Sequence, residues 1–372
     1  MLKIAVAVKG TVDHPHAGGL LWMFLNWALG LRDVGCEVVW IEELPGARTP
    51  EAYREMIERT QRQLAPFGLG DRLCVVWRDG SDARSAVPSA RLVALDDAVD
   101  ADLLVNFKYD LAAPLVARFR RSALVDVDPV LLQRWIARGQ VETAPHDTWF
   151  TTGETVPAFA PQLGLTHPWQ YVPPCVHLDS WPAQDARPQT SFTTIVHWWA
   201  NAWTGDGENE KRHGFYPYLD LAAGAAAPLE LATDIPDGDG EADDLRRRGW
   251  RVSSAAAVAA TPETYRSYVQ SSIGEFSCAK PAYVREQCAW ISERTLNYLA
   301  SGRPAVVEHT GPSAFLPEAA GLFRFRTPGE ARAHLETAFD DYPRQSANAR
   351  ALAVERFDAR RSAAFVLEQA LA

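Results

Sequence analysis

The chain has 372 residues, of which 47% are apolar and 23% charged, and its 37 basic and 47 acidic residues give a net charge of −10. This composition excludes wholesale disorder, and the length predicts two domains, because a domain usually spans about 100–200 residues. The acidic balance argues against nucleic acid as a partner, because an acidic protein repels a polyanion unless a local basic patch overrides its net charge.

The N-terminal segment MLKIAVAVKG is expected to be a first strand of the mature protein, because Lys9 closes its apolar run and no cleavage site follows. No apolar stretch reaches the roughly 20 residues that a bilayer span needs. The five cysteines are scattered without paired or metal-type spacing, which favours reduced thiols. We therefore expect a soluble, cytoplasmic protein.

The first half alternates β-rich runs with helical patterns, which is typical of a parallel sheet covered by helices. The strands are expected at 3–9, 37–43, 72–77, 102–107, 123–128 and 148–153. A helix at 20–35 is apolar all round, so we expect it to be buried against the sheet. These elements predict an N-terminal Rossmann-like domain over residues 1–174.

Prolines then interrupt the alternation, and we place a linker at 175–190 and a second Rossmann-like domain at 191–372. Its strands are expected at 192–199, 229–234, 250–254, 273–277, 304–309 and 322–325, with helices near 216–223, 241–248, 262–269 and 292–301 and further helices at the C-terminus. Two doubly wound α/β domains facing across a cleft predict ligands beyond the carboxyl ends of the strands.

The segment ISERTLNYLASGRPAVVEH is the most informative stretch. Ser292 is placed to cap a helix, whose N-terminus offers free N–H groups and a positive dipole to a diphosphate. Arg294 would add a bidentate donor. The alternative is an ordinary capped helix in which Glu293 simply favours the dipole.

This pattern resembles the nucleotide-sugar segment of group 1 and spore-maturation-type bacterial glycosyltransferases, which have the GT-B fold. The likeness extends more loosely over IGEFSCAKPAYV and FRFRTPGEARAHL. It implies that Arg294 contacts the donor phosphate and that Gly302 and Pro304 form the turn into the next strand. Asn297 stands where many relatives have a ribose-binding Glu, and Glu293 is the other candidate for that contact. The resemblance also implies a donor on the second domain and an acceptor on the first.

Two more loops of the second half hold candidate donor contacts. Gly274, Glu275 and Lys280 lie in a loop segment that the resemblance assigns to the donor sugar, although a charged surface turn is the alternative. Lys211 and Arg212 lie where relatives place a basic pair that neutralises the diphosphate, and a solvated loop is the alternative. Lysines occur only at positions 3, 9, 108, 211 and 280, and the last four fall near predicted carboxyl ends of strands. Lysine is a compact point charge that arginine does not replace at a phosphate.

The loop VKGTVDHPHAGGLLW joins the first strand to the first helix. The resemblance implies that Gly18 and Gly19 approach the sugar and phosphate. His14 is our candidate general base for the acceptor hydroxyl, with Asp13 as the carboxylate that orients it and His16 as a cleft residue. A retaining enzyme would need no such base, and a flexible loop with incidental histidines is the alternative.

His146 and Asp147 abut a strand start and are further candidates for the cleft, with Trp203 as an aromatic wall. Asp126 and Asp128 are interpreted as structural, because Pro129 follows them and the metal-binding D-x-D motif of other transferases is not placed there. We predict no metal and no other cofactor.

These observations together predict metal-independent transfer of a sugar from a nucleoside-diphosphate donor to a small-molecule or glycan acceptor. The leaving diphosphate would be stabilised by the cations and the helix N-terminus. The alternatives are a nucleotide-sugar epimerase or hydrolase of the same fold and a two-domain binding protein without chemistry. No particular sugar, base or oligomeric state is predicted.

Overall fold

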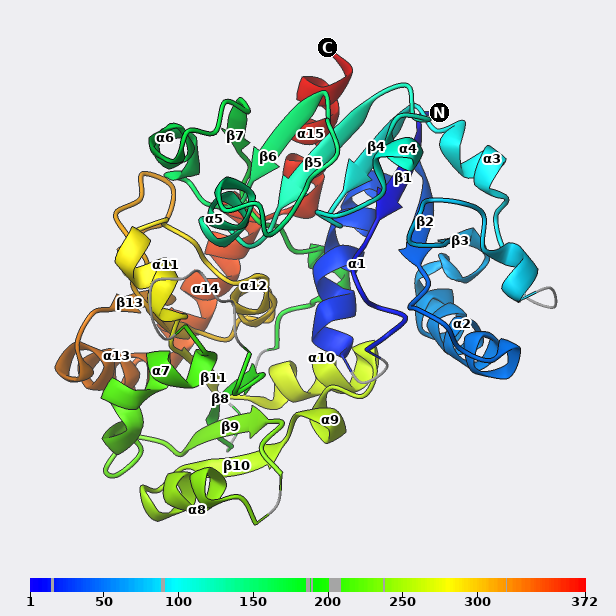
Figure 1. The fold of residues 1–372 in the computed structure, drawn as a ribbon. Coiled ribbons are helices and arrows are strands. Elements are labelled where there is room, and N and C mark those ends of the chain that lie inside the picture. The colour runs from blue at the N-terminus through cyan, green and yellow to red at the C-terminus, as the bar shows by residue number, and fades with distance from the viewer. Residues whose placement is uncertain are drawn as a thin grey trace. The chain divides into compact units, whose positions relative to one another are not determined.

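The computed structural model describes residues 1–14, 17–87, 91–184, 188, 190–200, 209–236, 238–318 and 320–372. The chain forms two compact units, each with its own parallel sheet (Figure 1). Unit 1 comprises Met1–Thr152, Val156–Pro173 and Ala359–Ala372, and unit 2 comprises Gly153–Thr155 and Pro174–Asp358. The predicted doubly wound α/β fold is therefore confirmed for both units.

The sheet of unit 1 is parallel throughout, with the order β3-β2-β1-β4-β5-β6-β7. Its strands are β1 (Lys3–Ala7), β2 (Glu37–Glu43), β3 (Leu73–Val76), β4 (Leu103–Asn106), β5 (Ser122–Asp126), β6 (Thr148–Thr151) and β7 (Trp169–Tyr171). The sequence predicted all of these except the short β7. The strand order reverses between β1 and β4, and ligands of such sheets bind beyond the carboxyl ends of the strands at that switch point.

The α-helices of unit 1 lie in the connections between its strands, except for the last, which follows unit 2 in the chain. They are α1 (Gly18–Asp33), α2 (Pro50–Leu64), α3 (Leu95–Val99), α4 (Ala113–Val116), α5 (Leu131–Ala137), α6 (Val156–Phe159) and α15 (Ala359–Leu371). Short 3-10 helices add η1 (Ala65–Phe67), η2 (Gly70–Arg72), η3 (Arg84–Ala86) and η4 (Ala160–Leu163). As predicted, α1 is buried all round, with Trp22 and Trp27 almost wholly inaccessible to solvent.

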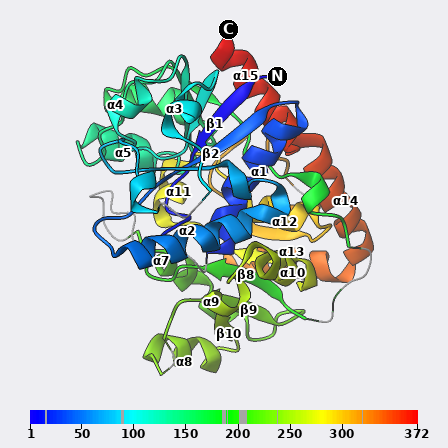
Figure 2. The same cartoon turned by 90° about the vertical axis from the view of Figure 1, so that its right-hand side faces the viewer.

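The last helix, α15, belongs to unit 1, although the sequence-based division placed it in the domain 191–372. Both views show this red helix with the blue elements of unit 1 (Figures 1 and 2). It packs so closely on α1 that a Cβ added to Gly30 would lie 2.7 Å from the Ala359 carbonyl oxygen. An ion pair of 2.8 Å joins Asp33 at the end of α1 to Arg360. The chain returns because α1 is apolar on the side that the sheet leaves open.

The sheet of unit 2 is also parallel throughout, with the order β10-β9-β8-β11-β12-β13. Its strands are β8 (Phe192–Val196), β9 (Leu229–Thr233), β10 (Arg251–Ser254), β11 (Gly274–Ser277), β12 (Ala305–Glu308) and β13 (Leu322–Phe325). All were predicted from their apolar runs. The switch point of this sheet lies between β8 and β11.

The α-helices of unit 2 are α7 (Lys211–Phe215), α8 (Gly240–Arg247), α9 (Ala255–Val258), α10 (Pro262–Ser271), α11 (Pro281–Glu286), α12 (Glu293–Ala300), α13 (Pro328–Asp340) and α14 (Tyr342–Arg356). The helix expected near 216–223 is the 3-10 helix η6 (Tyr216–Leu221), and another, η5 (Leu178–Ser180), precedes the sheet. No helix of the described residues has the length and apolar character to span a membrane.

The described part of the segment predicted as a linker is packed into unit 2. The Val176 amide donates to the Phe357 carbonyl at 2.8 Å, and Trp181 is fully buried with its ring edge on Tyr265. The short insertion Gly153–Thr155 also joins unit 2, where the Glu154 carboxylate accepts a 2.9 Å hydrogen bond from the Ala314 amide. The described part of this segment is thus packed into unit 2 and is not a free connection.

Candidate functional site

Lysines flank the switch points of both sheets. Lys9 and Lys108 follow β1 and β4 in unit 1, whereas Lys211 and Lys280 lie in the connections after β8 and β11 in unit 2. These are four of the five lysines of the chain. The structure thus confirms that each lies beyond the carboxyl end of a strand, the edge at which doubly wound sheets bind ligands.

Arg294, in the first turn of α12, spans the switch point of unit 2. Its guanidinium donates to the Ile195 carbonyl of β8 at 3.1 Å and to the Ser277 hydroxyl of β11 at 2.7 Å. Nε donates to Glu275 Oε1, also on β11, at 2.7 Å. The predicted phosphate ligand is therefore fixed by protein groups on both strands, with 16% of its side chain exposed.

Burial and charge act in opposite directions on Arg294. Burial by itself lowers the pKa of the guanidinium, but the Glu275 carboxylate outweighs it, so the pKa of Arg294 lies above its usual value. Glu275 has no exposed surface, and its second oxygen has no hydrogen-bond partner within the described structure. Such a buried pair persists because removing either charge leaves the other uncompensated.

Lys211 begins α7 and is also buried, with 8% of its surface exposed. Its ammonium donates to the Cys278 carbonyl, just beyond β11. Burial, followed by the positive charge of Arg294, lowers the pKa of Lys211 to about 7. Lys211 therefore holds a proton that it can lose near neutral pH, and an anion arriving beside it would favour the charged form.

Gly214 lets α7 approach the loop after β11. A Cβ at this position would lie 1.9 Å from the Ala279 carbonyl oxygen, which is a backbone clash. We expect Gly214→Ala to lower the free energy of unfolding by about 3 kcal/mol, as in other overpacked interiors. Urea unfolding measures the loss, and Gly240→Ala is the matched control, because a Cβ at Gly240 meets no atom within 4 Å. Equal effects of the two substitutions would contradict this account.

The N-terminus of α12 faces a small cavity. Ser292 caps the helix as predicted, since its side chain accepts a hydrogen bond from the Arg294 amide. The cavity has a volume of about 20 Å³ and is lined by Ser292, Arg294 and Glu308 among others. That volume admits about one water or one oxygen of a larger group.

Glu308, at the end of β12, is not among the site residues predicted from the sequence. It accepts hydrogen bonds from the Ala279 amide at 2.8 Å and from the Tyr218 hydroxyl at 3.2 Å. Burial raises the pKa of its carboxyl, and the charge of Lys211 acts against that rise. Its position near the carboxyl end of the predicted strand 304–309 could have identified it as a site residue.

Several predicted donor contacts have other roles in the structure. Arg212 pairs with Glu210 at 2.5 Å and with Glu241, so its charge is already neutralised. Asn297 is buried, and its amide lies 3.5 Å from the Tyr265 hydroxyl of α10. Glu293, in the first turn of α12, is buried as well, with 7% of its surface exposed.

Gly274 and Lys280 lie at opposite edges of the sheet of unit 2. Gly274 begins β11 and therefore lies at the amino edge, where a Cβ would meet the Pro304 carbonyl oxygen at 2.3 Å. Its lack of a side chain allows strands to pack, so the prediction that it contacts the donor is replaced by this structural role. Lys280 lies at the carboxyl edge as the residue before α11.

In unit 1, the loop after β1 leads into α1, whose N-terminal amides receive no side-chain cap from the described residues. Ala17 supplies no side-chain cap, and no acidic residue occupies the first turn, which starts at Gly18 and Gly19. His14 Nδ1 lies 2.9 Å from the Gly10 carbonyl oxygen. A carbonyl only accepts, so Nδ1 carries the proton and Nε2 is the basic nitrogen. The predicted orienting role of Asp13 is thus filled by a backbone carbonyl.

The predicted cleft pair of unit 1 has structural roles. Asp147 precedes β6 and accepts hydrogen bonds from the Ser122 amide and hydroxyl, so it lies at the amino edge. His146 is buried between the Asn106 amide group at 3.1 Å and the Ala144 carbonyl at 2.7 Å. Burial lowers the pKa of His146 to about 4, which keeps the ring neutral. His16 and Trp203 lie outside the described residues.

Asp126 and Asp128 have partners within unit 1, in agreement with their structural interpretation from the sequence. Asp126 is fully buried and accepts hydrogen bonds from the Gln133 and Thr151 side chains at 2.9 and 2.8 Å. Burial raises its pKa to about 7. Asp128 accepts a 3.0 Å hydrogen bond from the Tyr109 hydroxyl.

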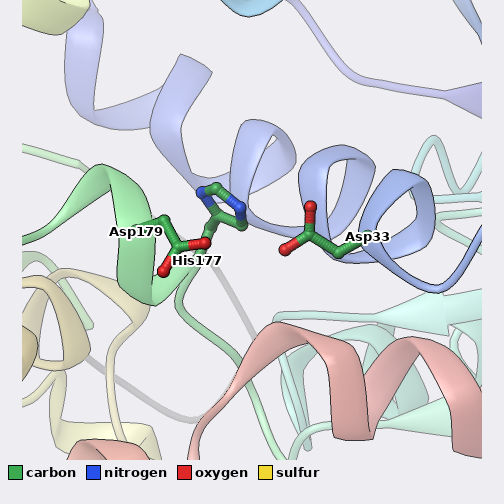
Figure 3. A group of neighbouring side chains, drawn as sticks. All are labelled: Asp33, His177 and Asp179. Carbon is green, nitrogen blue, oxygen red and sulfur yellow. The ribbon is translucent and has the colours of Figure 1, made fainter.

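Figure 3 shows three further side chains of metal-ligating types. Asp33, at the end of α1 in unit 1, pairs with Arg360 of α15. His177 and Asp179 lie near the start of unit 2, where the charge of Asp179 acts on Arg350. Because Asp33 pairs with Arg360 and His177 Nδ1 lies 2.7 Å from the Ser180 hydroxyl, we assign no metal site to this group.

Solved structures that are similar to this chain over nearly its whole length include glycosyltransferases. HepE of Anabaena in complex with UDP-glucose is 14% identical, with 99% of this chain and 100% of that chain covered and a TM-score of 0.56. AviGT4, a glycosyltransferase involved in avilamycin A biosynthesis, is 16% identical, with 99% and 97% covered and a TM-score of 0.53. An α-glucosyltransferase in complex with UDP and a 13-mer DNA is 11% identical over 100% of both chains, with a TM-score of 0.62.

No protein-family model matches the chain, and neither does any curated protein. The likeness to the solved structures extends over the whole chain, and at these identities it shows the fold. The fold is thus that of the GT-B glycosyltransferases, as the resemblance of the segment ISERTLNYLASGRPAVVEH predicted.

Proposed function

We propose that this protein transfers a sugar from a nucleoside-diphosphate donor to an acceptor hydroxyl, and that unit 2 binds the donor. The observation that carries the proposal is the cationic group at the β8/β11 switch point. Lys211 lies within electrostatic reach of both Arg294 and Lys280, and the buried carboxylate of Glu275 pairs with Arg294. When Lys211 is protonated, these three cations exceed the two carboxylates of Glu275 and Glu308, and this balance favours an anionic ligand.

The chemistry of the donor matches this group of charges. A nucleoside diphosphate carries negative charge that increases when the bond to the sugar breaks, and fixed cations stabilise it most in a site from which water is excluded. Lys211, whose pKa is about 7, gains a full charge when the diphosphate arrives. The fold supports the choice of ligand, because solved structures with this fold contain UDP or UDP-glucose.

The transfer step can be written with the residues of this chain. The acceptor oxygen forms a bond to the anomeric carbon, while the bond from that carbon to the β-phosphate oxygen breaks and leaves its electron pair on the diphosphate. The hydroxyl proton passes to Nε2 of His14, the nitrogen left basic by the bond from Nδ1 to Gly10. In this proposal the protein cations, with no metal, take up the charge of the leaving group.

We propose a small molecule or a glycan as the acceptor. One solved structure of this fold is a complex with DNA, but the net charge of −10 here disfavours a polyanionic acceptor. A DNA acceptor would require a basic surface that overrides this charge.

A panel of nucleoside diphosphates and their sugars tests the donor site. We expect at least one to raise the melting temperature, because a ligand at 100 times its Kd stabilises the folded state by about 2.7 kcal/mol. Differential scanning fluorimetry with UDP, GDP, ADP, TDP and the matching glucose conjugates gives the result, and the free nucleosides are the control. No stabilisation by any diphosphate would overturn the proposal.

Incubation with the stabilising donor alone separates transfer from the alternative reactions. A transferase consumes its donor slowly until an acceptor is added, whereas a hydrolase or epimerase needs none. Rapid loss or epimerisation of the donor sugar without acceptor, followed by NMR, would replace the transferase assignment.

A further inference from the structure

A second and larger cavity lies wholly within unit 1. It has a volume of about 700 Å³, within the range of roughly 300–1,000 Å³ usual for small-molecule sites. Asp13 from the loop after β1, Glu43 at the end of β2 and Trp77 directly after β3 all line it. The cavity is therefore formed at the carboxyl edge of three neighbouring strands, where doubly wound sheets bind ligands.

Most of the charged groups at this cavity neutralise one another. Glu43 lies 3.4 Å from the Lys108 ammonium, which donates to Asp110 at 2.8 Å. Asp110 in turn lies 3.5 Å from Arg78. Burial opposes the charged form of Asp110, yet the Lys108 hydrogen bond and charge hold the pKa of its carboxyl below its usual value. This chain of ion pairs leaves no net charge for a ligand.

Two lining residues are outside that chain of ion pairs. Within the described residues, neither the Asp13 carboxylate nor the Arg48 guanidinium makes a hydrogen bond or ion pair, and both are exposed. The cavity thus offers one hydrogen-bond acceptor of negative charge and one planar, positively charged donor. A guanidinium without a partner among the described residues favours a carboxylate or phosphate, to which it binds with two parallel hydrogen bonds.

An aromatic wall completes the cavity. The rings of Trp77 and Tyr53 form a T-shaped pair, with centroids 5.5 Å apart and an interplanar angle of 73°. The Tyr53 hydroxyl in turn accepts a 3.0 Å hydrogen bond from the Arg48 amide, so the loop that carries Arg48 is tied to the same aromatic pair. Trp77 is half-buried, and such a fixed ring provides a face for a sugar or another flat ring.

We propose that this cavity binds the acceptor, and that the acceptor is a ring-containing molecule with an anionic group. The ring lies on Trp77, the carboxylate or phosphate pairs with Arg48, and a hydroxyl donates to Asp13. Calling this ligand the acceptor rests on the proposed function, but the chemistry of the ligand follows from the cavity itself. A glycan with acidic sugars and a phosphorylated small molecule share this chemistry.

Binding of matched probes tests the ligand chemistry directly. The probes are p-nitrophenyl β-D-glucuronide, the neutral p-nitrophenyl β-D-glucoside, glucose 6-phosphate and glucose, titrated calorimetrically into the full chain. We expect the anionic member of at least one pair to bind about tenfold more tightly than its neutral partner. Preference for the glucuronide assigns a carboxylate, and preference for the sugar phosphate assigns a phosphate. Equal affinities within both pairs would overturn the proposal.

Variants place the binding in this cavity. Arg48→Gln should remove the preference for the anion and leave the neutral probe unaffected, whereas Arg54→Gln, an exposed α2 residue outside the lining, should change neither. Trp77→Leu should weaken both members of a pair equally, and Asp13→Ala should weaken the glucoside by about tenfold. Equal losses in Arg48→Gln and Arg54→Gln would contradict the assignment.

The nucleotide melting shift distinguishes this inference from the proposed function. Arg48→Gln should retain the full shift with the stabilising nucleoside diphosphate, because Arg48 belongs to unit 1. If no nucleotide stabilises the protein but Arg48-dependent binding of an anionic ring persists, the donor proposal fails and the cavity assignment stands. A normal nucleotide shift without any discrimination between the probes would overturn the cavity assignment and leave the donor proposal intact.

Discussion

Replacing Arg294 by Met should lower the free energy of unfolding of unit 2 by about 3–5 kcal/mol, the usual cost of breaking a buried ion pair. The reason is Glu275, which is fully buried and would lose its 2.7 Å partner. The hydrogen bonds from Arg294 to Ile195 and Ser277 would be lost at the same time. Hydrogen–deuterium exchange of the unit 2 amides measures the stability of that unit directly.

The double variant Arg294→Met/Glu275→Gln distinguishes loss of the ion pair from a general loss of stability caused by the substitution at Arg294. It should recover most of the lost stability, because it leaves no uncompensated charge, but it should not recover nucleotide binding. Arg247→Met is the matched control: Arg247 is 68% exposed and pairs with Asp244 at 3.3 Å on the surface of α8, so its loss should cost less than about 0.5 kcal/mol. Additive losses in the double variant would show that the pair is not the cause.

Lys211→Met should weaken binding of the stabilising nucleoside diphosphate by about 10–100-fold at pH 6, the effect of losing one charge-assisted hydrogen bond. For the native protein we expect affinity to fall as the pH rises above about 7, because the pKa of the free Lys211 ammonium is about 7 and the diphosphate binds its charged form. Calorimetry in two buffers of different ionisation enthalpy should show uptake of about one proton at pH 8. Affinity that does not vary with pH in the native protein would exclude Lys211 as the diphosphate ligand.

The pH dependence of the protein's stability is a second test of the lowered pKa of Lys211. Its folded pKa, about 7, lies below the ordinary lysine value of 10.5, so the unfolded chain binds more protons between these values and stability rises with pH across that window. Below pH 7 the full cost of burying the ammonium is present. Lys211→Met should flatten this rise, whereas Lys3→Met should leave both the rise and the nucleotide affinity unchanged, because Lys3 lies at the amino edge of β1 in unit 1.

Much of the fold could be predicted from the sequence because its signals are local. Apolar runs of strand length alternating with helical patterns predicted every strand except β7, whose three residues, Trp169–Tyr171, are too few to show a period. Ser292 was identifiable as a helix cap from its position before α12. The lysines at the carboxyl edges followed from the same strand assignments, since a residue after a parallel strand always reaches that edge.

The partners of the site residues were not predictable in the same way. Nothing near Arg294 in the sequence indicates that it would span β8 and β11, because its three partners lie 17–99 positions away. His14 was assigned an orienting carboxylate from its neighbour Asp13, but the turn after β1 brings the Gly10 carbonyl to Nδ1 instead. A residue type suggests a chemical role, whereas its protonation and its partner depend on which backbone groups the fold brings near it.

The sequence by itself therefore determined the class of fold, the succession of strands along each half of the chain and the edge of each sheet at which cations gather. Only the tertiary structure decided that Lys211 is buried with a lowered pKa, that α15 returns to cover α1 and that Asp13 belongs to a cavity with Arg48 and Trp77. The physical reason is range: periodicity and capping act over a few residues, whereas burial, charge compensation and cavity shape depend on segments that meet only when the chain has folded.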